Sequence, residues 1–211
     1  QMCIRDRTSF YDLIRGDILF ENCTLDDYVL IKSDGYPTYH LANIVDDHSM
    51  QISHVLRAEE WVSSTPRHVL LYKAMGWTPP LFAHLPMILG PDRSKLSKRH
   101  GATAINEYSE QGFLRETMIN FLALLGWSLD DKTELMSVDE IIAQFSLERI
   151  SKTAAIFNRE KLEWMNGVYI RALDADDFKR RVMPFLEADL PRNIARPLDS
   201  EYISSMLPLI K

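Results

Sequence analysis

The hydrophobic pattern of the chain changes near Ala104, and this change limits the folds that the sequence can adopt. Before it, apolar β-type runs at 52–59 and 81–89 enclose a helical segment at 65–76 that starts with a Thr-Pro pair and stops at glycine. After it, amphipathic helical segments follow one another, several with Ser or Asp at the capping position. The order predicts an α/β layer of parallel strands, with ligands bound beyond their carboxyl ends, and then a nearly all-helical half.

Shorter elements precede that layer. Residues 10–31 are predicted to form short strands, interrupted where a Gly-Asp pair and a Glu-Asn pair occur. The SDGYP stretch at 33–37 has the composition of a turn, and apolar residues at helical spacing follow it from Thr38.

Composition excludes several classes of protein. The 211 residues are 46% hydrophobic, which is typical of a globular chain that can bury a core. No apolar run approaches the roughly 18 residues that cross a bilayer, and the N-terminus lacks the layout of a secretion signal. We therefore expect a soluble, cytoplasmic protein with no membrane partner. Neither Cys3 nor Cys23 has metal-ligand spacing, so no structural metal is predicted.

A short basic stretch stands out in a chain whose formal net charge is −6. The sequence RSKLSKRHG at 93–101 follows the apolar run 81–89, and its cations alternate with serines between glycine borders. Each charge-assisted contact to a phosphate contributes roughly 1.5–3 kcal/mol, so such a loop could hold a polyphosphate. A solvated basic surface loop is the alternative, and the residues alone leave both interpretations open.

The stretch KLSKR at 95–99, with PMILGPDRS before it and HGAT after it, resembles the second signature motif of class I aminoacyl-tRNA synthetases, KMSKS. In this extended form it is similar to the glutamyl-tRNA synthetases, although Leu96 replaces methionine and Arg99 replaces the last serine. The resemblance implies that Lys98 contacts the ATP phosphates and stabilises the departing pyrophosphate, and that Lys95 assists. Ser97 and Arg99 complete the expected phosphate contacts.

The segment 34–61 resembles the glutamate pocket of the same family. Tyr39 and Asn43 are four residues apart, so they share one face of the predicted helix, and Arg57 lies at the end of the following strand. The resemblance implies that all three hold the glutamate substrate, with Arg57 paired to its side-chain carboxylate. Without it, a partly buried helix face and surface ion pairs would be the preferred explanation of these residues.

Other nucleotide contacts rest on the resemblance alone. It places Glu60 and Trp61 near the ribose and base of ATP, and the backbone of Met87 and Ile88 against adenine. The DDH sequence at 46–48 contains three residue types that can bind a metal. Adjacent residues on a helix point in different directions, however, so we interpret it as capping and polar support rather than as a metal site. Mg2+ is expected to arrive bound to ATP.

The resemblance also implies a domain organisation and an activity. Residues 1–33 would end a connective, acceptor-binding insertion, and 34–105 would form the second half of a Rossmann-like catalytic domain. Residues 106–173 would form a helical stem-contact domain, and 174–211 the start of a helical anticodon-binding domain. The expected activity is ATP-dependent ligation of L-glutamate to tRNA(Glu), through glutamyl-adenylate, by a monomer.

Both ends of the chain look cut, so we expect a segment of a longer protein. It contains no counterpart of the family's N-terminal HIGH-motif part and stops before most of the anticodon-binding region. The expectation is that the segment alone does not catalyse the reaction. Three alternatives remain: a glutaminyl-tRNA synthetase-like enzyme, a truncated transferase that glutamylates a modified tRNA base, and a non-catalytic module that binds tRNA or a partner.

Overall fold

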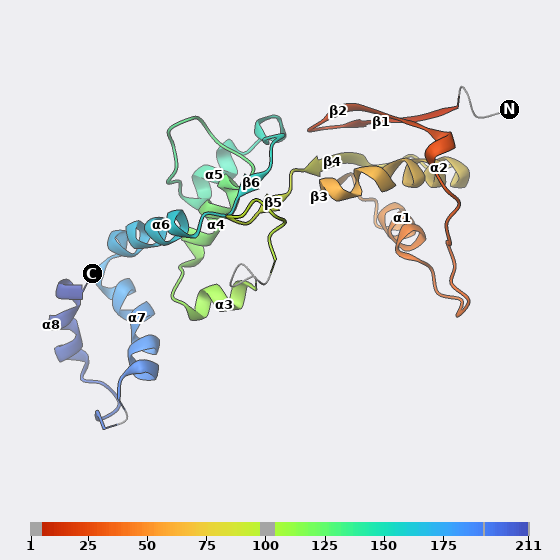
Figure 1. The fold of residues 1–211 in the computed structure, drawn as a ribbon. Coiled ribbons are helices and arrows are strands. Elements are labelled where there is room, and N and C mark those ends of the chain that lie inside the picture. Colours follow the sequence, from red (N-terminus) through yellow and green to blue (C-terminus); the bar gives the residue numbers. More distant parts are fainter. Residues whose placement is uncertain (1–5, 98–103, 192, 211) are drawn as a thin grey trace.

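The computed structural model describes residues 6–97, 104–191 and 193–210. A small sheet with two helices lies at one end of an elongated arrangement, and the C-terminal helices lie at the other (Figure 1). The short strands β5 and β6 lie between these two ends, next to the helices of the middle segment (Figure 1).

The sheet is mixed, with strand order β2-β1-β4-β3. Its strands are β1 (Arg7–Asp12), β2 (Gly16–Glu21), β3 (His54–Ala58) and β4 (Leu81–Leu85). Strands β1, β4 and β3 are parallel, and β2 is antiparallel to β1 in a hairpin. The predicted parallel layer is therefore present. The hairpin joins this layer through β1, so residues on both sides of the expected boundary at 33 share one sheet.

Helices α1 (Tyr39–Ser49) and α2 (Thr65–Met75) lie together on one side of the sheet (Figure 1). Local signals set their ends. Gly35, with φ of +83°, forms the turn before α1, and Gly76, with φ of +72°, ends α2 in the left-handed conformation that favours glycine. A 3-10 helix, Glu59–Ser64, joins β3 to α2 within the crossover between β3 and β4.

The apolar run 81–89 does not form one strand, contrary to the sequence-based prediction. Strand β4 ends at Leu85, and β5 (Ile88–Leu89) belongs to a separate two-stranded sheet with β6 (Ala155–Ile156). Pro86 has no N–H to continue the ladder, and the N–H of Met87 donates to Glu59 Oε1 at 3.1 Å instead. The chain therefore leaves the first sheet and pairs with the helical half.

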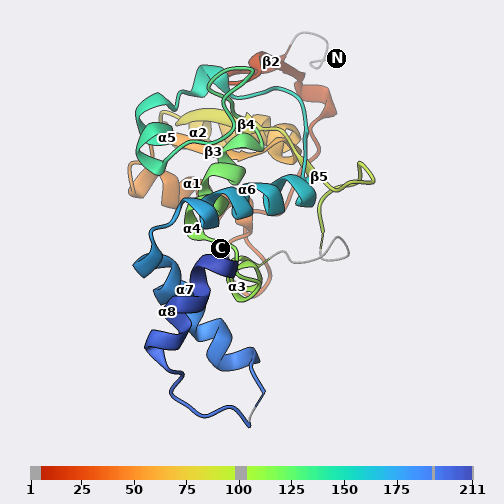
Figure 2. The same ribbon diagram turned by 90° about the vertical axis from the view of Figure 1, so that its left-hand side faces the viewer.

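The second half is helical, as the periodicity predicts, apart from β6. Its helices are α3 (Ile105–Glu110), α4 (Arg115–Leu124), α5 (Val138–Gln144), α6 (Arg159–Ala172), α7 (Ala175–Asp189) and α8 (Ser200–Ile210). Ser137 and Glu140 form a capping box on α5, while Asn158 and Asp174 cap α6 and α7. Figure 2 shows α7 and α8 side by side, and Lys179 joins them by donating to Ser204 Oγ at 2.7 Å.

One apolar cluster crosses the expected boundary near residue 105. Ile14 and Ala83 of the sheet region pack in the same buried cluster as Trp127, Ile141 and Ile150 of the helical half. Burial of this shared surface stabilises the two parts together, because removal of apolar area from water is the dominant favourable contribution to folding. The second cluster lies within the helical half, around α4 and α6.

We expect Leu162→Ala to lower the free energy of unfolding by about 2–5 kcal/mol in urea denaturation of this chain. Leu162 in α6 is 0% exposed, so its truncation leaves a cavity in the cluster around α4. Leu122→Ala, at a side chain that is 48% exposed, is the matched control and should change stability by about 0.5 kcal/mol or less. Equal losses from both variants would contradict the packing of α6 against this cluster.

Candidate active site

Side chains from several elements meet at the carboxyl ends of β3 and β4. Helix α1 contributes Tyr39 and Asn43, and Arg57 comes from β3. Glu60 and Trp61 lie on the 3-10 helix that follows. This is the edge of a parallel layer at which ligands bind in α/β proteins.

The guanidinium of Arg57 is held by neutral groups on α2 and β4. Its Nε donates to His84 Nε2 at 3.1 Å, and one terminal nitrogen donates to Thr65 Oγ1 at 2.8 Å. The other terminal nitrogen lies 3.3 Å from His68 Nδ1. Among the described residues, no carboxylate forms an ion pair with Arg57 in this arrangement. A partly buried cation is therefore held in place without being neutralised.

Burial lowers the pKa of Arg57 from its ordinary value, and the nearby Tyr39 and Asp47 oppose this shift. The guanidinium also lies over two aromatic rings, at 5.5 Å from the ring centroid of Phe82 and 5.7 Å from that of Trp61. Cation–π contacts of this kind favour the charged form. Arg57 therefore remains a fixed positive charge at the base of the site.

Tyr39 and Trp61 form an aromatic wall beside Arg57. Their ring centroids are 4.7 Å apart with an angle of 41° between the planes. Asn43 lies one turn after Tyr39 on α1, and its Oδ1 is buried with no hydrogen-bond partner among the described residues. Buried acceptors are normally paired, so this oxygen is available to a bound donor.

The basic loop returns to the same site. Lys95 Nζ lies 2.5 Å from Glu60 Oε2, although the two residues are separated by 35 positions. Both side chains are substantially exposed, so the pair contributes little to stability. It does show that the loop after β5 reaches the 3-10 helix next to Arg57. The structure thus brings together five residues predicted from the sequence: Tyr39, Arg57, Glu60, Trp61 and Lys95.

The other residues that were expected to contact phosphate are only partly described. Ser97 is exposed at the end of the described part of the loop. Lys98 and Arg99, which the resemblance makes the principal and the last cations of the motif, lie outside the described residues.

The backbone of Met87 and Ile88 is already engaged with other parts of the chain. The N–H of Met87 donates to Glu59, and its carbonyl accepts from the N–H of Ala155 at 3.2 Å. The carbonyl of Ile88 accepts from the N–H of Leu96 at 3.0 Å. These bonds hold the loop that carries Lys95, and they use groups that were expected to meet adenine.

Sequence reasoning missed the residues that support Arg57. They are Asp12, Thr65, His68 and His84, all of which are buried. Thr65 and His68 are three positions apart on α2, but Asp12 and His84 lie 72 residues apart, and no local spacing relates those two to each other or to the helix. One signal was available, because a histidine within the apolar run LFAHLPMIL is an unusual residue in a buried strand.

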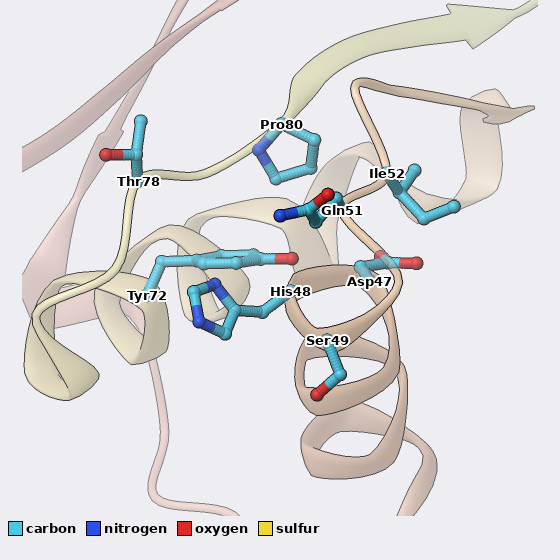
Figure 3. Close-up of a pocket in the computed structure, with 8 residues that line it drawn as sticks. All are labelled: Asp47, His48, Ser49, Gln51, Ile52, Tyr72, Thr78 and Pro80. Atoms are coloured by element: carbon cyan, nitrogen blue, oxygen red, sulfur yellow. The ribbon is translucent and has the colours of Figure 1, made fainter.

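A separate cavity of about 510 Å³ lies beside the last turn of α1 (Figure 3). Its lining includes Asp47, Gln51 and Tyr72, and Figure 3 shows the Tyr72 hydroxyl pointing toward the other two. Burial raises the pKa of Asp47, and burial together with the Asp47 charge raises the pKa of Tyr72 to about 12. No predicted site residue lines this cavity, so we place it outside the candidate active site.

A family model described as tRNA synthetases class I (E and Q), catalytic domain, matches residues 2–164. The chain belongs to this family. It is 63% identical over 205 residues to a glutamate--tRNA ligase from Dehalococcoides mccartyi (strain CBDB1), covering 97% of this chain and 42% of that ligase. A glutamate--tRNA ligase from Moorella thermoacetica is 52% identical over 202 residues, covering 95% of this chain and 41% of its own length. The chain therefore spans about two fifths of the curated relatives that it matches.

Solved structures of this family have the same fold. A crystal structure of a glutamate tRNA ligase from Elizabethkingia meningosepticum CCUG26117, in complex with its amino acid, matches with a TM-score of 0.86. The sequence identity is 39%, and the match covers 100% of this chain and 44% of that structure. The mixed sheet followed by helices is thus an arrangement shared with this class I family.

Two kinds of feature are absent from the described residues. None of their helices combines the length and the apolar character that a bilayer crossing requires. They also contain no group of three or more His, Cys, Asp or Glu side chains that could hold a metal ion.

We expect stability to fall as the pH is lowered through about 6.5, and His68 to cause part of this loss. Burial and the nearby Arg57 lower the pKa of His68 to about 3, whereas an unfolded histidine takes a proton near 6.5. Between these values the unfolded state binds more protons, which lowers the free energy of unfolding by on the order of 1–2 kcal/mol between pH 6.5 and 5. Urea denaturation at both pH values measures this difference.

The variant His68→Gln should reduce the difference between the two pH values, and His54→Gln, at an exposed position of β3, should not. An unchanged pH dependence in the His68 variant would refute the burial of a neutral histidine beside Arg57.

Proposed function

We propose that this chain carries the glutamate-binding and phosphate-binding elements of a glutamate--tRNA ligase. The reaction joins glutamate to ATP as glutamyl-adenylate with loss of pyrophosphate, and then transfers the glutamyl group to the terminal ribose of tRNA(Glu). Support comes from family membership and from the similar ligases of Dehalococcoides mccartyi and Moorella thermoacetica. This activity is proposed for a whole ligase. The present chain matches about two fifths of the length of such an enzyme.

One observation carries the proposal: Arg57 is a partly buried cation that donates hydrogen bonds to the neutral side chains of Thr65 and His84 and lies beside His68. An unneutralised charge in such a position favours an anionic ligand. A guanidinium presents its N–H groups in a planar fork that matches a carboxylate. The side-chain carboxylate of glutamate fits this requirement, whereas the neutral amide of glutamine does not supply the opposite charge.

The other groups around Arg57 suit the rest of an amino acid. The Oδ1 of Asn43, unpaired among the described residues, is an acceptor for an ammonium group, and the Tyr39 ring closes one side of the site. The match to a ligase structure solved with its amino acid is consistent with this assignment for the present chain.

We assign the ATP phosphates to the basic loop, with Lys98 and Lys95 as the principal cations and Ser97 and Arg99 as further contacts. Lys95 reaches Glu60, so a nucleotide bound between the 3-10 helix and this loop would lie next to the glutamate site. Cations held there stabilise the negative charge that develops as the α-phosphate is attacked and pyrophosphate leaves. Mg2+ is expected to enter the site bound to the phosphates of ATP.

Glu60 and Trp61 are assigned to the ribose and base of ATP. Met87 and Ile88 are assigned to adenine through the second lone pairs of their carbonyls, because each carbonyl already accepts one bond within the chain and the Met87 N–H is used by Glu59.

The domain organisation is part of the same proposal. Residues 34–105 would belong to the second half of a Rossmann-like catalytic domain, to which the hairpin within 1–33 adds strands through β1. Residues 106–173 would contact the tRNA stem, and 174–211 would begin the anticodon-binding region of a monomeric ligase.

The assignment of Arg57 can be tested in a hybrid ligase, in which this chain replaces the matching segment of the Dehalococcoides mccartyi enzyme. We expect Arg57→Ala to raise the KM for glutamate about tenfold to a hundredfold, because a charge-assisted contact is lost. Arg57→Lys keeps the charge but not the fork, and should give an intermediate KM. The measurement is ATP–pyrophosphate exchange in the presence of tRNA, with the KM for ATP as an internal reference.

Arg171→Ala, at an exposed position of α6, is the matched control for that series. Glutamate saturation that is the same in the Arg57 and Arg171 variants would exclude Arg57 from the amino-acid pocket.

We expect Lys98→Ala in the hybrid ligase to reduce the rate of ATP–pyrophosphate exchange by about tenfold or more, with little change in the KM for glutamate. The lysine is assigned to charge that develops during the reaction, and removal of such a group typically costs about a hundredfold or more in rate. Lys132→Ala, at an exposed turn position, should leave the exchange rate unchanged. An exchange rate in the Lys98 variant equal to that of the control would remove the basic loop from the mechanism.

A further inference from the structure

A buried chain of hydrogen bonds runs from the end of β1 to the guanidinium of Arg57. Asp12 and His84 are both 0% exposed, and they come from neighbouring parallel strands. Asp12 Oδ2 accepts from the backbone N–H of His84 at 3.0 Å and lies 2.5 Å from His84 Nδ1. His84 is in turn the cross-strand partner of Arg57, and its Nε2 accepts from Arg57 Nε at 3.1 Å.

The two carboxyl oxygens of Asp12 have different hydrogen-bond partners. Oδ1 accepts from the N–H groups of Ile14 and Arg15, at 3.0 and 2.9 Å, and so holds the turn between β1 and β2. Oδ2 faces His84. Three backbone N–H groups donate to Asp12, two to Oδ1 and one to Oδ2, and this set of donors favours the carboxylate. A carboxylate has no proton to donate, so the proton between Asp12 and His84 is assigned to the histidine Nδ1.

This proton position decides what His84 offers to Arg57. Burial lowers the pKa of His84, so its imidazole is neutral and carries a single N–H. With that hydrogen on Nδ1, the Nε2 atom is an acceptor for the Nε–H of Arg57. In the other tautomer, the N–H of His84 could donate only to Thr65 Oγ1, which lies 3.1 Å from Nε2, and the bond from Arg57 Nε would be lost.

The bond to His84 sets the plane of the guanidinium. Together with Thr65 and His68 it uses three of the five N–H groups of Arg57. The other two, one on each terminal nitrogen, are left to bond to Tyr39, whose hydroxyl raises the pKa of Arg57, or to a ligand carboxylate. Rotation of the guanidinium would turn these two N–H groups of Arg57 away from the site.

We infer that Asp12 and His84 are positioning residues for glutamate: Asp12 selects the His84 tautomer that orients Arg57 toward the substrate carboxylate. The inference rests on the proposed function of Arg57 and adds two residues that do not themselves contact the amino acid. It also gives the hairpin a part in substrate recognition, because Asp12 is the last residue of β1.

The first test uses Asp12→Asn in the hybrid ligase. The amide oxygen can still accept from Ile14 and Arg15, whereas its NH2 group cannot accept from His84. We expect the KM for glutamate to rise about tenfold to a hundredfold, with the KM for ATP unchanged within about twofold. Asp17→Asn, an exposed carboxylate of the same hairpin, is the matched control and should change neither value.

A double-mutant cycle separates positioning from an independent effect. In an Arg57→Ala background, Asp12→Asn should raise the KM for glutamate less than about twofold, because the group that it positions is gone. Additive effects would overturn the inference while leaving the role of Arg57 intact. An Arg57→Ala variant with unaltered glutamate KM would instead refute the proposed function, and the inference would fall with it.

A pair of substitutions at His84 covers the case in which Asp12→Asn does not fold. His84→Gln and His84→Leu both lose the side-chain bond to Asp12, but only glutamine presents an acceptor near the position of Nε2. The glutamate KM should therefore be at least severalfold lower in His84→Gln than in His84→Leu. Equal values would overturn the inference.

The proton position can be observed directly. Two-dimensional 15N–1H correlation spectra of the histidine-labelled hybrid ligase should show His84 protonated at Nδ1, and Asp12→Asn should move the proton to Nε2. A proton on Nε2 in the unsubstituted protein would overturn the inference, whatever the kinetic constants.

Discussion

A guanidinium held by neutral acceptors is the interaction on which the candidate site depends. Arg57 is bonded to His84, His68 and Thr65, and it lies over the rings of Phe82 and Trp61. These contacts fix its direction, but they leave its charge without an opposite partner among the described residues. The free energy of a partly buried cation is thus lowered most by an anion that enters the site. This arrangement supports the proposed carboxylate substrate.

The second requirement is that the basic loop, to which we assign the ATP phosphates, returns to the same place. The break at Pro86 makes this possible, because the chain leaves β4, pairs with β6 and turns back so that Lys95 meets Glu60. Glu59 supports the break by accepting from the N–H of Met87 while its other oxygen pairs with Arg15 of the hairpin. The amino-acid and nucleotide sides of the site are therefore linked by the few residues that follow β3.

The shared cluster around Trp127 gives this arrangement a rigid base. It joins the sheet to the helical half across the expected domain boundary, so the loop between them is anchored at both ends. Under the proposed function, such a link would align tRNA contacts of the helical half with the proposed site of adenylate formation. Close-packed interiors transmit small displacements, so this cluster couples the positions of the two parts mechanically.

Local chemistry in the sequence determined the helices, their capping residues, the turn at Gly35 and the strand at Arg57, because each depends on neighbours a few residues away. The resemblance to glutamyl-tRNA synthetases supplied Tyr39, Asn43 and Arg57 as pocket residues. Only the tertiary structure decided the division of 81–89 into two strands, the approach of Lys95 to Glu60, and the chain from Asp12 through His84. These contacts depend on the register of parallel strands and on crossovers between them, which bring together residues up to 72 positions apart that no local periodicity relates.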